Sequence, residues 1–211
     1  MAETTLEKSP APGPPALRRS PLAHLYGAMR AAGVEGARGV RLSERPFLTM
    51  VSLRVDPASA AATRVGTALG APLPAHCGDT ARTGLHRVLW LGPDEWLVLS
   101  RTDGAALVRE IRDALAGDPG SAVDVSANRT TLELGGPAAR QVLEKGCALD
   151  LHPRSFGPGR AVTTQVGPVP VVLWQTDDVP TYRLLPRSSF ADYLAHWLMD
   201  AMREFRAPAV P

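Results

Sequence analysis

The 211-residue sequence has few aromatic residues, two cysteines and almost no imbalance of charge. Cys77 and Cys147 are too few for the disulfide framework of a small secreted domain. The 23 basic and 21 acidic residues leave a net charge of +2, which gives no electrostatic footprint for nucleic acid or an acidic membrane surface. We therefore expect neither of these as a partner.

Long apolar runs are also missing from the sequence. No run approaches the ~18 residues that a membrane-spanning helix needs, and no charged-then-apolar leader begins the chain. These absences predict a cytoplasmic protein whose thiols are reduced.

The sequence does contain enough apolar residues for a substantial core. Hydrophobic residues make up 45% of the chain, which suits one compact domain or two half-sized lobes. The first residues differ, because four prolines and a glycine between residues 10 and 15 prevent a helix and little apolar material accompanies them. Residues 1–19 are therefore predicted to form a disordered tail.

The rest of the chain is organised around residues 122–153, which read as strand, turn, strand and helix. Gly146 suits a left-handed end for that helix. Across the whole chain, the predicted strands are 40–44, 47–55, 84–91, 96–100, 123–125, 130–134, 161–166, 169–174 and 181–185. The predicted helices are 22–32, 58–69, 104–116, 138–145 and 188–206.

This order of elements predicts an α+β fold with two lobes of mostly antiparallel sheet and packed helices. The lobes would span residues 20–120 and 121–211. Strands that are neighbours in sequence are expected to pair, so that Asp124 and Arg129 would interact across the turn between their strands. Period-two alternation with short turns argues against a doubly wound parallel sheet.

The sequence contains one glycine motif at the start of a predicted helix. Gly135-Gly136-Pro137 follows a strand, but it has neither the spacing of the dinucleotide fingerprint nor a P-loop lysine. We interpret it as the entry to a helix, with an anion bound at that helix N-terminus as the alternative.

Two possible constellations of reactive groups share His152. A metal site would require His76-Cys77 to converge with Cys147 and His152, without any paired-ligand spacing. A hydrolase triad would use Ser126, Asp150 and His152, but no nucleophile elbow surrounds the serine. We interpret these residues as structural and predict neither a metal site nor a catalytic residue in this chain.

The four tryptophans are candidates for the core or for an interface. Trp90, Trp96, Trp174 and Trp197 lie on predicted strands and a helix, which favours the core. The alternative for any one of them is a subunit interface, where aromatic residues are over-represented.

Five stretches, taken in their order and spacing over residues 18–205, resemble a known family. They are Arg19-Ser20-Pro21-Leu22, Leu91–Leu97, Val123–Ser126 with Arg129, Gly146–Pro153, and Arg187–Leu194 followed by Trp197-Leu198. The family is the gamma subunit of heterotetrameric sarcosine oxidase. In addition, Gly135–Ala139 resembles the G-P-x-A helix entry of the aminomethyltransferases.

The resemblance implies a role inside a larger enzyme. The family's holoenzyme demethylates sarcosine oxidatively to glycine, forms hydrogen peroxide, and passes the one-carbon unit to tetrahydrofolate or releases formaldehyde. FAD, FMN, NAD and tetrahydrofolate would belong to other subunits, and this chain would hold no cofactor. Its implied partners are the alpha, beta and delta subunits, with the main contact to alpha. Its implied fold resembles the folate-binding fold of aminomethyltransferases.

We therefore predict a non-catalytic subunit that stabilises and helps to assemble a sarcosine oxidase, an oxidoreductase with CH–NH donors and oxygen as acceptor. One alternative is a free-standing folate-binding one-carbon transferase. In that case Asp124, the only carboxylate that the predicted fold places at its centre, would hold the pterin. A second alternative is a gamma-like subunit of an oxidase for another N-methyl amine, such as dimethylglycine.

Overall fold

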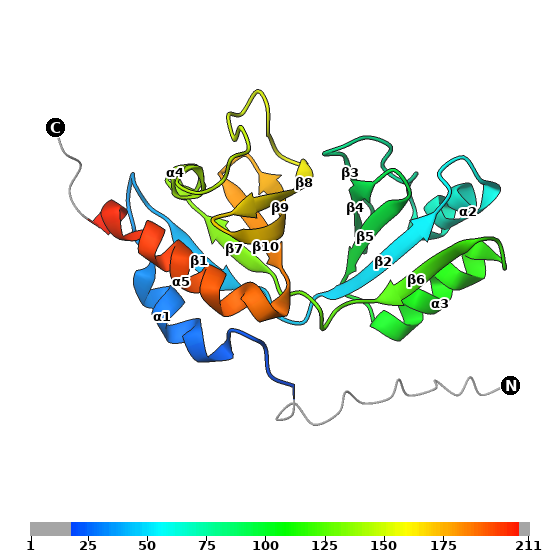
Figure 1. Cartoon of the computed structure of the whole chain (residues 1–211), viewed down its shortest axis with the longest axis horizontal. Coiled ribbons are helices and arrows are strands. Elements are labelled where there is room, and N and C mark those ends of the chain that lie inside the picture. The colour runs from blue at the N-terminus through cyan, green and yellow to red at the C-terminus, as the bar shows by residue number, and fades with distance from the viewer. Residues whose placement is uncertain (1–17, 207–211) are drawn as a thin grey trace, which may run out of the picture.

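The computed structural model describes residues 18–206, which form two packed halves, each a five-stranded sheet with helices on one face (Figure 1). The strands are β1 (Arg41–Glu44), β2 (Thr49–Val55), β3 (Thr80–Arg82), β4 (His86–Gly92), β5 (Glu95–Ser100), β6 (Gly120–Asp124), β7 (Leu132–Gly135), β8 (Ala161–Val166), β9 (Val169–Asp177) and β10 (Thr181–Pro186). The α-helices are α1 (Tyr26–Ala32), α2 (Ala60–Leu69), α3 (Gly104–Leu115), α4 (Ala139–Glu144) and α5 (Ala191–Ala201). Short 3-10 helices occupy Ala23–Leu25, Ser188–Phe190 and Arg203–Arg206. All pairings between these strands are antiparallel, so the predicted α+β fold is confirmed.

We call one unit the terminal half, because it is built from both ends of the described chain. Its sheet has the order β1-β7-β10-β9-β8, and α1, α4 and α5 cover its outer face (Figure 1). On α5 the apolar residues Ala191, Leu194 and Leu198 recur at helical spacing and are fully buried. They pack with strand residues such as Leu134 and Leu184, and each leucine buried in this way contributes ~1.5–3 kcal/mol relative to exposure.

The other unit, the middle half, has a sheet of order β3-β4-β5-β2-β6 covered by α2 and α3 (Figure 1). Leu107, Ile111 and Leu115 form the predicted apolar stripe of α3, and all three are buried. Both helices begin at a capping side chain, since Ser59 Oγ and Asp103 Oδ2 each accept a hydrogen bond from a first-turn backbone N–H.

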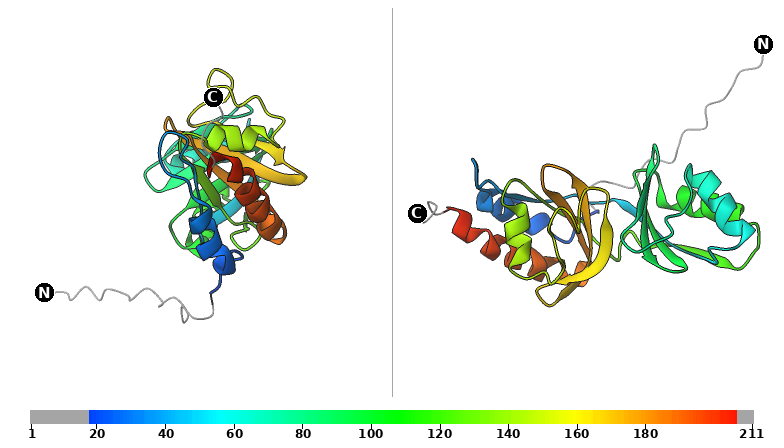
Figure 2. Two further views of the ribbon diagram at one scale, coloured as in Figure 1. Left: turned by 90° about the vertical axis from the view of Figure 1, so that its left-hand side faces the viewer. Right: turned by 90° about the horizontal axis from the view of Figure 1, so that it is seen from above.

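The two sheets face each other, and the helices lie outermost (Figure 2). A third apolar cluster fills part of the space between the sheets. From the middle half it takes Met50, Leu89, Leu97 and Leu99, and from the terminal half Ala161, Val172, Trp174 and Leu185. The molecule is therefore layered as helices, sheet, sheet and helices.

The predicted pairing of sequence neighbours is wrong at two places. β1 and β2 are separated by four residues but lie in different sheets, and so do β6 and β7. The two connecting segments run side by side, since Arg45 N donates to Thr131 O and Val125 N donates to Met50 O, both at 2.8 Å. Each strand joins the sheet that buries its own apolar side chains, as Leu42 of β1 does beside α1 and β7.

The two halves also differ from the predicted lobes 20–120 and 121–211. α1 and β1 belong to the terminal half, whereas β6 pairs with β2 in the middle half. Because the chain crosses twice between the sheets, the terminal half is discontinuous in sequence. The predicted tail, residues 1–19, lies outside the described residues except for Arg18 and Arg19.

Local predictions differ from the structure in two further respects. β3 was not predicted, because its three residues are too short to show an alternating pattern. Gly146 is not left-handed; instead, a Cβ there would lie 2.4 Å from the Trp197 ring, so this glycine makes room for the indole against the end of α4.

Candidate functional site: an arginine-lined cleft between the sheets

The inner faces of the two sheets change from leucine to arginine along the strands. Side chains two residues apart on a strand share a face, so the alternation fixes which residues meet. The inner-face positions are Leu97, Leu99 and then Arg101 along and just beyond β5, Leu89 and Arg87 along β4, and Leu185 and Arg183 along β10. The leucines form the apolar cluster between the sheets, and the arginines lie beyond it.

A cleft of about 690 Å³ opens where the arginines replace the leucines. Its lining includes Arg82, Arg87 and Arg101 from the middle half and Arg183 with Trp174 from the terminal half. None of the residues that line it is an aspartate or a glutamate. The cleft is therefore a concentrated positive region in a chain whose net charge is only +2.

The four arginines differ in how they are held. Arg87 Nη1 donates to the backbone oxygens of Thr83 and His86, each at 2.8 Å. Arg183 Nε donates to Glu133 Oε2 at 3.0 Å, and its guanidinium carbon lies 5.1 Å from the centre of the Trp174 ring.

The other two arginines lie at the rim. Arg82 and Arg101 are exposed, and within residues 18–206 neither side chain has a hydrogen-bond or ion-pair partner. These two guanidinium groups are therefore free to contact a molecule that enters the cleft.

Burial, and then the charges of Arg82, Arg183 and Arg101, lower the pKa of the Arg87 guanidinium. The positive charges of three neighbouring arginines therefore act on Arg87, and the lining contains no carboxylate to offset them. The region is thus electrostatically uncompensated on the side that faces the cleft.

Glu133 on β7 balances the opposite side of this positive region. Its carboxylate accepts hydrogen bonds from Arg183 at 3.0 Å and from Arg45 at 2.7 Å. Burial alone would raise the pKa of Glu133, but the hydrogen bonds and charges of the two arginines outweigh it, so the pKa is lowered. Glu133 is therefore an ionised anchor for Arg183 outside the lining of the cleft.

The wall of the cleft is tied together across the two halves. Thr80 Oγ1 donates to Gly159 O at 2.5 Å, and Ala161 N donates to Gly78 O at 3.0 Å. Arg160 adds an ion pair to Asp79 at 2.9 Å. These contacts join β3 and the loop before it to the start of β8, so the shape of the cleft is largely pre-formed.

Trp174, which also lines the cleft, has an indole N–H group without a hydrogen-bond partner within residues 18–206. The residue is 5% exposed, and its indole Nε1 is buried without a hydrogen-bond partner among the described residues. A buried N–H without an acceptor is unfavourable, and such groups are rare in folded proteins.

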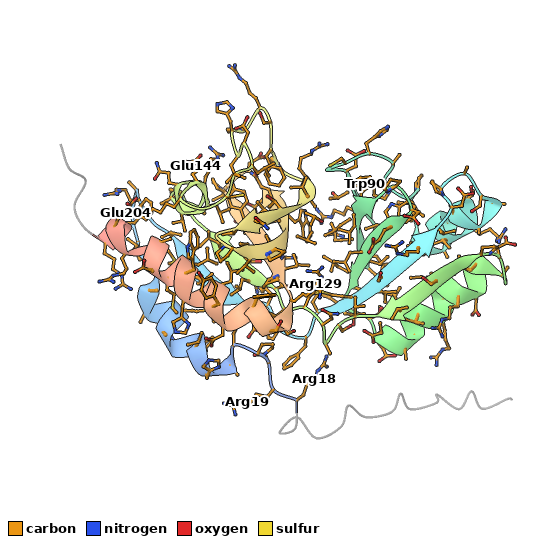
Figure 3. The ribbon with its side chains drawn as sticks, in the orientation of Figure 1. Arg18, Arg19, Trp90, Arg129, Glu144 and Glu204 are labelled. Carbon is orange, nitrogen blue, oxygen red and sulfur yellow. The ribbon has the colours of Figure 1, made fainter. Side chains whose placement is uncertain are left out.

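Asp124, the carboxylate singled out from the sequence, lies outside the cleft. It is exposed at the end of β6, where Oδ1 accepts hydrogen bonds from Ser126 N at 2.9 Å and Ser126 Oγ at 2.5 Å. Its predicted partner Arg129 lies at the junction of the halves (Figure 3) and donates instead to Leu185 O at 2.8 Å. The predicted pairing of Asp124 with Arg129 is therefore wrong, because β6 and β7 do not form a hairpin.

The residues of the possible hydrolase triad, Ser126, Asp150 and His152, belong to separate hydrogen-bond networks. Ser126 is bonded to Asp124 and to the backbone of Met50, whereas Asp150 accepts from Ser155 Oγ at 2.5 Å and from His152 N at 2.9 Å. The hydrogen bonds from Ser155 and from the His152 backbone lower the pKa of the Asp150 carboxyl. This arrangement is an Asx-type turn in the loop after α4.

The imagined metal ligands are also dispersed. Cys77 is exposed and Cys147 is buried, while His76 lies 3.3 Å from Asp79 on the surface. Among residues 18–206, no three histidine, cysteine or acidic side chains lie close enough together to hold a metal ion.

Gly135-Gly136-Pro137 lies where two segments of backbone pack closely against each other. Gly136 has φ +123°, and a Cβ there would lie 2.5 Å from Gly39 O. The glycine therefore permits a close approach of two backbones, and the short helix α4 begins two residues beyond the motif, at Ala139.

The tryptophans divide between the cores. Trp96 is buried, and its Nε1 donates to Pro74 O at 2.8 Å, while Trp174 belongs to the cluster between the sheets. Trp90 and Trp197 are partly buried against the cores of the middle and terminal halves.

A further pocket, of about 530 Å³, lies beside Trp96 between α2 and the loop that follows it. No ionisable side chain lines it, so it offers no group for acid–base chemistry. In the part of the chain that the structure describes, no helix is long and apolar enough to cross a membrane.

The sequence-based reasoning missed the arginine-lined cleft. Its residues come from β3, β4, β5, β9 and β10 and from the adjoining loops, which only the crossing of the chain between the sheets brings together. The sequence signal for the cleft was the replacement of leucine by arginine at same-face positions of two predicted strands. The same replacement is also typical of the edge of an apolar core, so it does not identify a cleft by itself.

Comparison with known proteins gives a consistent result. The model of the family described as sarcosine oxidase, gamma subunit, matches residues 53–204. A sarcosine oxidase subunit gamma from Corynebacterium sp. (strain U-96) is 48% identical over 195 residues, which is 92% of this chain and 94% of that protein. A protein of the same description from Arthrobacter sp. is 46% identical over the whole of both chains.

Solved structures agree with these relatives. A chain of the heterotetrameric sarcosine oxidase from Corynebacterium sp. U-96 superposes with a TM-score of 0.88 at 47% identity, covering 92% of this chain and all of that one. The aminomethyltransferase of the Bartonella henselae glycine cleavage system superposes with a TM-score of 0.63 at 14% identity, covering 90% of this chain and 62% of that one. The second likeness concerns the fold alone.

Proposed function

The chain belongs to the sarcosine oxidase gamma subunit family, and from this premise we propose that it is the gamma subunit of a heterotetrameric sarcosine oxidase. The observation that carries the proposal is the structural match to a chain of that enzyme. The match covers the whole of that enzyme's chain, at 47% sequence identity.

The proposed contribution of this chain is assembly. FAD, FMN, NAD and tetrahydrofolate would be held by other subunits, and this chain would supply no catalytic residue. Its partners would be the alpha, beta and delta subunits, with alpha as the main contact. A stable assembly of this kind buries more than ~2,000 Å² in total.

The outer helical face of the terminal half is the surface that we propose for docking. Phe190 and Tyr193 are three residues apart at the start of α5, and they are 42% and 52% exposed. Two exposed aromatic side chains on one turn suit the centre of an interface, where aromatic residues are enriched.

Co-expression tests this proposal. The tagged chain would be produced with candidate alpha, beta and delta subunits and purified through its tag, followed by size exclusion and a flavin absorption spectrum. We expect a yellow complex with one copy of each subunit that oxidises sarcosine. A colourless chain that elutes alone under the same conditions would contradict the subunit role.

A matched pair of variants tests the docking surface. Phe190→Ser with Tyr193→Ser should reduce the yield of the complex severalfold. Val179→Ser, at a residue 67% exposed in the turn between β9 and β10, should leave the yield unchanged. Equal yields from both variants would place the interface elsewhere without affecting the assignment to the complex.

A further inference from the structure

We propose that the arginine-lined cleft binds a small multivalent anion bearing carboxylate or phosphate groups, and that this anion bridges the two halves of the chain. Carboxylate and phosphate oxygens are the groups that guanidinium forks recognise by paired hydrogen bonds. The proposal concerns this chain alone and does not depend on a catalytic role for it.

The size and placement of the cleft fit such a ligand. Its volume of about 690 Å³ lies in the usual range for small-molecule sites. Arg82, Arg87 and Arg101 contribute from the middle half and Arg183 from the terminal half, so a ligand with two or more anionic groups would contact both sheets.

The charges of the cleft lack an internal counterion. The guanidinium groups of Arg82 and Arg101 have no hydrogen-bond or ion-pair partner within the described chain, and the lining includes no carboxylate. Glu133 is bonded to Arg183 and Arg45 and stands outside the lining, so it leaves the rim uncompensated. Two or more negative groups entering the cleft would remove the mutual repulsion of the guanidinium groups.

Trp174 holds one of these arginines at the cleft. The guanidinium carbon of Arg183 lies 5.1 Å from the centre of the Trp174 ring, and Arg183 Nε donates to Glu133 Oε2 at 3.0 Å. Both side chains line the cleft, so Arg183 is a positive group held in place on the side of the terminal half.

The test uses the full chain and two probes, citrate and inorganic pyrophosphate, titrated calorimetrically at constant ionic strength. We expect saturable binding of at least one probe with one site per chain, and a rise in the midpoint of thermal unfolding as that probe saturates. Which of the two binds more tightly distinguishes a carboxylate from a phosphate ligand. Acetate, with a single charge, should bind much more weakly than citrate.

Two double variants locate the site. Arg82→Gln with Arg101→Gln removes two groups that have no partner in the fold, and it should weaken binding of the probe at least tenfold, because each charge-assisted hydrogen bond accounts for about a tenfold effect or more. The matched control, Arg19→Gln with Arg109→Gln, removes the same charge from exposed positions outside the cleft and should leave binding unchanged.

Three results would overturn the proposal. The first is the absence of saturable binding of either probe to the full chain. The second is an equal loss of affinity in both double variants, which would indicate a general effect of net charge. The third is loss of probe binding in the assembled complex, because the cleft would then be covered by a neighbouring subunit rather than open to a small anion.

Discussion

The two parts of the space between the sheets differ in kind, although the same strands build both. In one part Leu99, Leu185 and Trp174 are buried against one another. In the other part, two residues away from Leu99 and Leu185, Arg101 and Arg183 border an open cleft. The apolar part holds the two halves together, whereas the arginine part gains nothing from closing, because like charges would be brought into a region of low dielectric.

A sheet-on-sheet interface can in this way leave room for a ligand. The change from leucine to arginine at inner-face positions coincides with two backbone irregularities, because Arg101 follows the end of β5 and the pairing of β9 with β10 shifts between Thr181 and Tyr182. The cleft therefore lies where both the residue type and the strand pairing change.

The largest effect is expected in the apolar part. Leu185→Ala removes a fully buried side chain between the sheets and should lower the free energy of unfolding by about 2–5 kcal/mol. Leu85→Ala, at a residue that borders the cleft and is 65% exposed, should change it by less than about 0.5 kcal/mol. Urea denaturation of both variants measures the contrast, and similar losses would show that the cleft region is packed as tightly as the cluster.

An intermediate effect is expected at Glu133, beside the arginine part. Glu133→Gln replaces the charged acceptor of Arg45 and Arg183 and should lower the free energy of unfolding at pH 7 by about 1–3 kcal/mol. The folded-state pKa of Glu133 is lowered, so its contribution is complete above the unfolded-state pKa, near 4.5, and declines as the pH falls below that value toward the folded-state pKa.

The wild-type chain and the Gln variant should therefore differ in stability at pH 6 and 7 and converge as the pH is lowered below about 4.5. Denaturation curves of the two chains between pH 7 and pH 3.5 provide the comparison. A stability difference that stays constant over this range would mean that Glu133 acts through its shape and not through its charge.

The smallest effect is expected at the rim of the cleft without ligand. Arg82→Gln with Arg101→Gln removes no contact and relieves repulsion, so at low salt the free energy of unfolding should rise by up to about 0.5 kcal/mol. The gain should vanish in 1 M salt, where the screening length falls to about 3 Å. A loss of stability in thermal unfolding at both salt concentrations would show that these side chains hold the cleft in shape.

The sequence was sufficient for most local elements of this fold, although not for the three-residue strand β3. Stripes such as Leu107, Ile111 and Leu115 and period-two runs such as 161–166 carry their secondary structure in their own spacing. Tertiary pairing was not accessible in the same way. The segments 45–48 and 125–131 look like hairpin turns, yet both cross between sheets, because pairing depends on which distant core buries residues such as Leu42.

The candidate site was less predictable than the fold for the same reason. Arg87 and Arg183 are 96 residues apart in sequence, and only the crossing connections bring their strands to face each other. Membership of the family, by contrast, was carried by stretches such as Gly146–Pro153, whose order and spacing the sequence shows directly.

We propose that this chain assists a sarcosine oxidase without taking part in its chemistry, and the turnover number of the assembled complex is the decisive measurement. The complex would be prepared with Asp124→Asn, Ser126→Ala, Asp150→Asn and His152→Ala combined in this chain, and its flavin content measured. If this chain supplies no catalytic group, the turnover number per flavin should lie within about twofold of wild type. A loss of a hundredfold or more, the usual effect of removing a general acid or base, in a complex of normal composition would contradict it.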